Sequence, residues 1–206
     1  MIAHFARVLI VGTAVISLGI SSQAAEKDFS SKLVDSSVRF EKIQLPDEIK
    51  RVNPTSRELG EDWYVIEAKF DTLDDITEEV SVKFFTDMVD TLKEEKNSTV
   101  ILTAEVTFIN VRKGTGHLAT AYLHPSAIQR YGGTSGSKGI KKANVHVDLI
   151  ENGQSTGPGI DLRKEKDPAW YTSFTQVPGV LVTLKDSPFW PLEMLKFNQI
   201  KSTNTR

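Results

Sequence analysis

The sequence predicts a mainly β protein: an immunoglobulin-like antiparallel β-sandwich with short helical connections. Apolar and polar residues alternate with period two in many segments, and no segment shows a long helical period. An Asn-Gly dipeptide, which suits a tight hairpin turn, follows one of the alternating runs. Because each such strand has one apolar face to bury and one polar face to wet, two packed antiparallel sheets satisfy the pattern.

The alternation is clearest in the middle of the chain. Between Val100 and Ile109, every second residue from Val100 to Phe108 is apolar. Similar patterns give about eight strands in all. They lie at residues 34–43, 64–70, 80–84, 100–109, 118–123, 145–149, 160–162 and 180–184.

The connections have their own signals. Asn152-Gly153 predicts a tight turn after the strand at 145–149, and a Gly-Pro-Gly stretch predicts a bulge or bend before Ile160. Short connecting helices are expected at Asp87 to Glu95 and Pro125 to Arg130.

The N-terminus has the three parts of a signal peptide. A basic region ends at Arg7, an apolar run extends from Val8 to Ile20, and small residues precede Ala24. The run is shorter than the ~20 residues that span a bilayer, so a retained anchor is the weaker alternative and no permanent membrane anchor is expected. We predict cleavage after Ala24, with Ala25 as the neighbouring choice, and a periplasmic or secreted mature protein.

This processing site sets the predicted organisation. Residues 1–24 form the signal peptide, residues 25–58 an N-terminal lead-in strand and connection, and residues 59–206 the β-sandwich domain. The chain has no cysteine, so it can form no disulfide and hydrophobic burial must stabilise the fold. A formal net charge of -2 gives no electrostatic basis for binding nucleic acid.

Several polar patterns resemble functional motifs but fail a direct test. The Gly132 to Gly139 loop has the composition of a phosphate-binding loop, yet Lys138 is followed by glycine instead of Ser or Thr. It also lacks the Gly-x-Ser-x-Gly pattern of a serine nucleophile. A mobile loop is the expected role.

The histidines and acidic residues also lack ligand spacing. His117 and His124 have an odd spacing, which places them on opposite faces of one strand. His146 and Asp148 share a face that we predict to be solvated. The acidic residues from Asp71 to Glu79 are expected in a solvated turn, because the glycine of a calcium loop is missing. We therefore assign no catalytic, cofactor-binding or metal-binding residue.

Aromatic residues near the C-terminus suggest a contact surface. Large rigid side chains contribute much of the binding energy at protein interfaces, and they stand here beside prolines and a glycine-rich loop. We predict that four residues contribute to a partner-binding surface, with the last as its anchor: Tyr131, Lys138, Trp170 and Trp190. Core packing is the alternative role for these aromatic side chains.

Four segments carry a resemblance to a known family. They are Trp63 to Glu67, Val100 to Asn110, Tyr122 to Pro125, and Ser187 to Leu192. The sequence resembles secreted immunoglobulin-like proteins encoded beside type IV pilus-like genes in Akkermansia and related Verrucomicrobia. The resemblance implies an immunoglobulin-like sandwich and an association with pilus assembly, and it supplies no catalytic residues.

These observations favour an exported, non-catalytic binding or assembly protein. Its expected partner is another envelope or pilus-associated protein, and no cofactor is expected. The alternative is an extracytoplasmic hydrolase or metal-dependent enzyme. An enzyme should show a concave pocket with converging titratable groups, whereas a binding module should show an exposed edge or an aromatic patch.

Overall fold

The structure is a computed structural model that describes most of the chain from Phe29 onward. The described residues are 29–45, 47, 62–92, 98–132, 140, 142–163, 167–190 and 200–201. Nine strands are present: β1 (Ser31–Leu33), β2 (Arg39–Gln44), β3 (Asp62–Val89), β4 (Thr99–Leu123), β5 (Val145–Glu151), β6 (Gln154–Ser155), β7 (Ile160–Asp161), β8 (Thr175–Pro178) and β9 (Leu181–Thr183). The helical elements whose full bounds lie within the described residues are α2 (Pro125–Tyr131) and the 3-10 turns η2 (Trp170–Thr172) and η3 (Leu184–Asp186).

All nine strands belong to one mixed sheet with the central order β6-β5-β3-β4-β8. Strands β1 and β2 pair with β3, β7 pairs with β5, and β9 pairs with β4. Every pair is antiparallel except β4 with β8, which is parallel.

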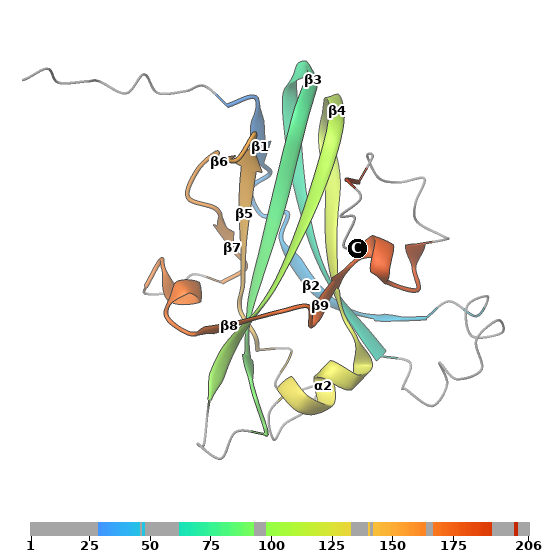
Figure 1. The fold of residues 1–206 in the computed structure, drawn as a ribbon, viewed down its shortest axis with the longest axis vertical. Coiled ribbons are helices and arrows are strands. Elements are labelled where there is room, and N and C mark those ends of the chain that lie inside the picture. Colours follow the sequence, from blue (N-terminus) through green and yellow to red (C-terminus); the bar gives the residue numbers. More distant parts are fainter. Residues whose placement is uncertain are drawn as a thin grey trace, which may run out of the picture.

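The sheet curls because its two longest strands bend together. In Figure 1, β3 and β4 rise side by side and turn back at the end of the molecule opposite α2. The pairing of β3 with β4 is irregular there, between Phe70 and Thr72 and again between Thr72 and Ile76. Such irregularities bend a strand and increase its twist. Each long strand therefore contributes to both halves of the curled sheet.

The main core lies between these two halves. One half contributes Ile66 and Phe70, and the other contributes Val82 and Phe108, all with no exposed surface. The rings of Phe70 and Phe108 approach to 5.6 Å between centroids, which joins the halves near the bend. The predicted alternation is confirmed on this inner face, since Val145 and its apolar neighbours on β5 are buried as well.

The mainly β prediction is confirmed, whereas the immunoglobulin-like arrangement stays a prediction. We expected two antiparallel sheets, and the structure has one hydrogen-bonded sheet with a parallel pair. The separate strands expected at 64–70 and 80–84 are one strand, as are those at 100–109 and 118–123. They are continuous because β3 and β4 keep pairing through the bend.

Two expected connections differ from the structure. The acidic residues from Asp71 to Glu79 lie within β3, so the predicted turn is wrong, although Asp74 and Asp75 are solvent-exposed as expected. The helix expected from Asp87 is also wrong at its start, because residues 87–89 extend β3 and pair with β4. Pairing with a partner strand outweighs the weak local helical pattern there.

The other local predictions are confirmed. Asn152 and Gly153 have φ angles of 50° and 81°, as a tight hairpin requires. Helix α2 begins after His124, whose Nδ1 accepts a hydrogen bond from the Ser126 backbone N–H at 3.0 Å. Helix α2 is joined to the end of β3 by Arg130, which donates two hydrogen bonds to the buried Asp90 carboxylate.

The described part of the N-terminal lead-in belongs to the sheet through β1 and β2. The predicted signal peptide and the boundary at residue 58 lie outside the described residues and stay predictions. Within the ranges that the structure describes, no helix is long and apolar enough to cross a membrane.

Candidate functional site

A histidine on the outer face of β5 is enclosed by acidic and aromatic side chains. The inner residues of β5 enter the core, so the alternation of the strand turns His146 and Asp148 to the opposite face. His146 Nε2 lies 2.9 Å from Asp148 Oδ1, and His146 Nδ1 lies 2.8 Å from Asp161 Oδ1 on β7. Only 2% of the His146 side chain is exposed. The two ring nitrogens therefore each meet a carboxylate away from bulk water.

The 3-10 turn η2 covers this histidine. The Tyr171 ring stacks on the imidazole at 3.8 Å between centroids, with 13° between the planes. Trp170 Nε1 donates a hydrogen bond of 3.1 Å to Asp161 Oδ1, the oxygen that also contacts His146. Trp170 packs against Phe85 in a small apolar cluster on this outer face. Residues 170 and 171 thus join η2 to both β5 and β7.

This environment favours the doubly protonated imidazolium form of His146. Burial on its own lowers the pKa of His146, but hydrogen bonds and charge interactions with Asp148 and Asp161 outweigh it and raise the pKa above the ordinary value. A neutral imidazole has one N–H and can donate to one carboxylate only. Burial and the same two carboxylates raise the pKa of Tyr171, so its phenol stays protonated in this region.

Gly159 allows the close approach of the backbone to this cluster. Its φ of +72° is in the left-handed region, and a Cβ added there would lie 2.5 Å from Asp148 Oδ1 and 2.6 Å from His146 Nε2. No side chain fits at that position without moving the Asp148 and His146 side chains. The predicted bend at the Gly-Pro-Gly stretch is therefore tied to the His146 cluster.

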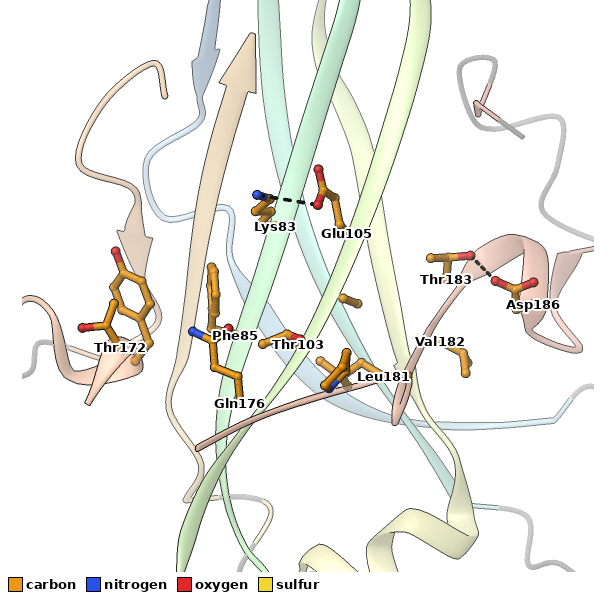
Figure 2. Close-up of a pocket in the computed structure, with 14 residues that line it drawn as sticks. Lys83, Phe85, Thr103, Glu105, Thr172, Gln176, Leu181, Val182, Thr183 and Asp186 are labelled. Atoms are coloured by element: carbon orange, nitrogen blue, oxygen red, sulfur yellow. Dashed lines mark hydrogen bonds and ion pairs between the residues drawn. The ribbon is translucent and has the colours of Figure 1, made fainter. Parts of the chain in front are cut away.

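Beside η2 lies a groove of about 720 Å³. Figure 2 shows Phe85 and Thr103 on the sheet between Thr172 on one side and Thr183 and Asp186 on the other. Tyr171 belongs to the wall of the groove as well as to the His146 cluster. Because η2 forms one wall, its position determines the width of the groove.

The groove has charged groups that are paired with one another. Lys83 Nζ lies 3.6 Å from Glu105 Oε2, and Asp186 Oδ2 accepts a hydrogen bond of 2.9 Å from the Thr183 hydroxyl. Figure 2 marks both interactions. A second hollow of about 520 Å³ shares Glu105, Thr183 and Asp186 with the groove. The two together follow the edge of β4, between β8 and the contact of Lys201 with β4.

The structure places three of the four residues predicted to contact a partner, and it places them in three different clusters. Tyr131 is 4% exposed in the main core, and Trp170 is 7% exposed in the cluster with Phe85. The expectation that these two side chains are exposed is wrong, because α2 and η2 turn them inward against the sheet. Trp190 is partly buried on a different cluster, and Lys138 lies outside the described residues. The partner contact itself stays a prediction.

The other motifs also have structural outcomes. The predicted solvated face around His146 is wrong, because η2 folds back over β5 from more than twenty residues along the chain. His117 Nε2 lies 3.1 Å from the Thr72 hydroxyl oxygen, and the His124 side chain caps the start of α2. Nearly all of the Gly132 to Gly139 loop lies outside the described residues. Among the residues that are described, no three His, Asp or Glu side chains are grouped to hold a metal ion.

Sequence reasoning identified His146 and Asp148 but missed Asp161 and Tyr171 as their partners. The signal was the His-x-Asp alternation on one strand face, followed by a returning strand that ends in an aspartate. Spacing places two residues on one face, but it does not show which distant segment covers them.

The fold and the groove define a mainly β protein with a curled sheet and an open surface site. Residues 22–204 match the model of a protein family, and the chain belongs to that family. A crystal structure of a protein from Akkermansia muciniphila is similar, with a TM-score of 0.66 and 22% sequence identity. That match covers 84% of this chain and 94% of the other, and it shows a shared fold. No curated protein matches the chain.

Proposed function

We propose that this protein is an exported, non-catalytic binding and assembly protein. Its contact surface is the groove between η2 and η3 together with the neighbouring edge of β4. The observation that carries the proposal is the groove itself: it is open, about 720 Å³ in volume, and lies next to a strand edge. Exposed sheet edges and grooves with apolar and polar walls are common sites for polypeptide partners.

The character of the groove favours binding over chemistry. Its floor carries Phe85 and Thr103, and its charges are paired as Lys83 with Glu105. His146 is the nearest candidate for acid-base chemistry. However, it is 2% exposed and both of its ring nitrogens face carboxylates, so it has no free nitrogen for a substrate. This arrangement gives the alternative role of a hydrolase or metal-dependent enzyme no specific support.

The setting of the proposed role comes from the resemblance. The shared fold with a protein from Akkermansia muciniphila is consistent with that resemblance, and secretion is part of the proposal. The finer part of the proposal is that the partner is an envelope or pilus-associated protein, and that Trp190 and Lys138 also contribute to binding it. Trp190 supports this part of the proposal because it is only partly buried.

A matched pair of glutamines tests the groove. Gln176 on β8 is exposed and lines the groove, whereas Gln44 on β2 is exposed elsewhere on the sheet. Gln176→Phe should fill the groove and reduce capture of envelope proteins by the tagged protein, measured by pull-down and mass spectrometry. Gln44→Phe should leave the capture unchanged. Equal capture by Gln176→Phe and the unmodified protein would show that the groove is not the contact surface.

A further inference from the structure

The contact surface proposed above has one wall that packs against a buried histidine. Residues 170–172 form η2, and Tyr171 and Thr172 line the groove. On the side away from the groove, η2 is attached through the stack of Tyr171 on His146 and the hydrogen bond from Trp170 to Asp161. Both attachments depend on where the His146 ring and the Asp161 carboxylate lie.

We propose that Asp148, His146 and Asp161 form a proton-dependent latch that holds η2 against the sheet and so sets the shape of the groove. The inference rests on the proposed function, because it concerns regulation of the same groove. With His146 protonated, both N–H groups donate to carboxylates and the ring is fixed beneath Tyr171. When the proton leaves, one carboxylate faces a nitrogen lone pair and that hydrogen bond is lost.

The groups that face His146 come from its own strand and from three other elements. Asp148 faces it from its own strand, Asp161 from β7 and Tyr171 from η2. From β3 it meets Phe85, which does not titrate, and Lys83 lies opposite Asp148 in the strand register. Histidine is the side-chain type whose ordinary pKa lies near neutral pH, so a change in that range at this site is assigned to His146.

The direction of the effect follows from the pKa. The pKa of His146 is raised in the folded protein, so the stabilisation by the latch is fully present below the pKa of an unfolded histidine. It is lost as the pH rises through the folded pKa. The latch is thus closed below the ordinary pKa of histidine and loosened as the pH rises past the raised pKa of His146.

The latch can be tested without any partner. Histidine NMR of the intact protein gives the pKa of His146, with His146→Gln used to assign its signal. Hydrogen exchange gives the opening of η2 through the amides of Thr172 and Ser173, which donate within this turn. The observed exchange rate of each amide is compared with its intrinsic exchange rate at the same pH, because the intrinsic rate itself rises with pH.

We expect protection of these two amides to fall at least about tenfold as His146 titrates, since about tenfold is the lower limit for one lost hydrogen bond to a charged group. Asp148→Asn should shift the His146 titration to lower pH and move the loss of protection with it. Asp74→Asn removes an exposed carboxylate at the bend of β3, away from His146. It should shift neither the His146 titration nor the loss of protection. In His146→Gln the protection should no longer depend on pH.

Two results would overturn the latch. One is a His146 pKa below that of an unfolded histidine, and the other is unchanged protection of η2 while His146 titrates. Neither result depends on a partner, so they are separate from the pull-down with Gln176→Phe. If Gln176→Phe loses capture but the protection of η2 does not follow the His146 titration, the proposed function stands and the latch is wrong. If the protection follows the titration but Gln176→Phe captures normally, the groove is not the contact surface.

Discussion

Adding one methyl group at Gly159 should destabilise the protein more than the same change at a similar glycine. Gly116 is the matched control, because its φ of +70° is close to the +72° of Gly159 and a Cβ added there meets nothing within 4 Å. Both alanine variants incur the backbone strain of the left-handed region, about 1–2 kcal/mol. Only Gly159→Ala also places its Cβ 2.5 Å from Asp148 Oδ1.

The extra cost at Gly159 comes from the His146 cluster. Asp148 or His146 must move to admit the methyl group, which breaks the 2.9 Å contact between them. A hydrogen bond to a charged group contributes about 1.5–3 kcal/mol, so the free energies of unfolding of the two variants should differ by about this amount. Asp148 is 21% exposed, so water screens part of this contact and the lower end of the range is expected.

Denaturant unfolding of the two variants in parallel measures this difference, with thermal unfolding as a second measure. For a chain of this size, about 1 kcal/mol corresponds to about 2–4 °C in Tm. The measurement belongs at mildly acidic pH, where His146 is protonated. If the two variants lose the same stability, the Asp148–His146 contact does not stabilise the fold and the reasoning is wrong.

Three further predictions follow from the fold and the sequence. Trp190→Ala should leave the protein folded, because Trp190 is only partly buried, and should reduce partner capture; a marked fall in Tm with normal capture would assign it to packing alone. The intact mass of the protein isolated from its own envelope should match a chain that starts at Ala25, and a mass that includes Met1 would contradict processing. A chelator should leave the Tm unchanged, whereas a large fall would reveal a structural metal ion.

The inner face of the sheet was predictable because burial is periodic along a strand. Every second residue from Tyr64 to Phe70 is apolar and is buried in the core, and the same holds for Val145, Val147 and Leu149. The hairpin at Asn152 was predictable for a local reason as well, since its positive φ angle needs a residue of that kind. Local patterns of this sort are set by the residues themselves.

The bend of the long strands could not be recognised in the same way. Acidic residues such as Asp74 and Asp75 led to the prediction of a turn, because a polar segment without apolar alternation is typical of loops. The segment nevertheless stays in the sheet, since Thr72 and Ile76 retain partners on β4. Its solvation was predictable from composition, and its pairing was not, because the partner strand lies about forty residues away.

The outer faces were the hardest part to predict. The sequence shows that Trp170 and Trp190 are large and lie near prolines, but not which side of the fold they reach. Trp170 covers one half of the sheet beside Ile101, while Trp190 packs near Trp63 on the other half. The burial of His146 depends on the same long-range cover. The candidate site was therefore visible only as separate pieces in the sequence.

The curled sheet itself explains why the groove lies where it does. Folding the sheet back on itself buries one face in a shared core, but it leaves two outer faces with apolar residues such as Ile101 and Val65. The chain covers these faces separately, with η2 on one half and the segment after η3 on the other. Strands β8 and β9 join the two covers across the edge of β4, and the groove is the space left between them. Because each cover is a small cluster outside the main core, local opening there requires less free energy than opening the core strands. The groove is therefore walled by segments that open more easily than the core strands, which suits the proposed role in binding a partner.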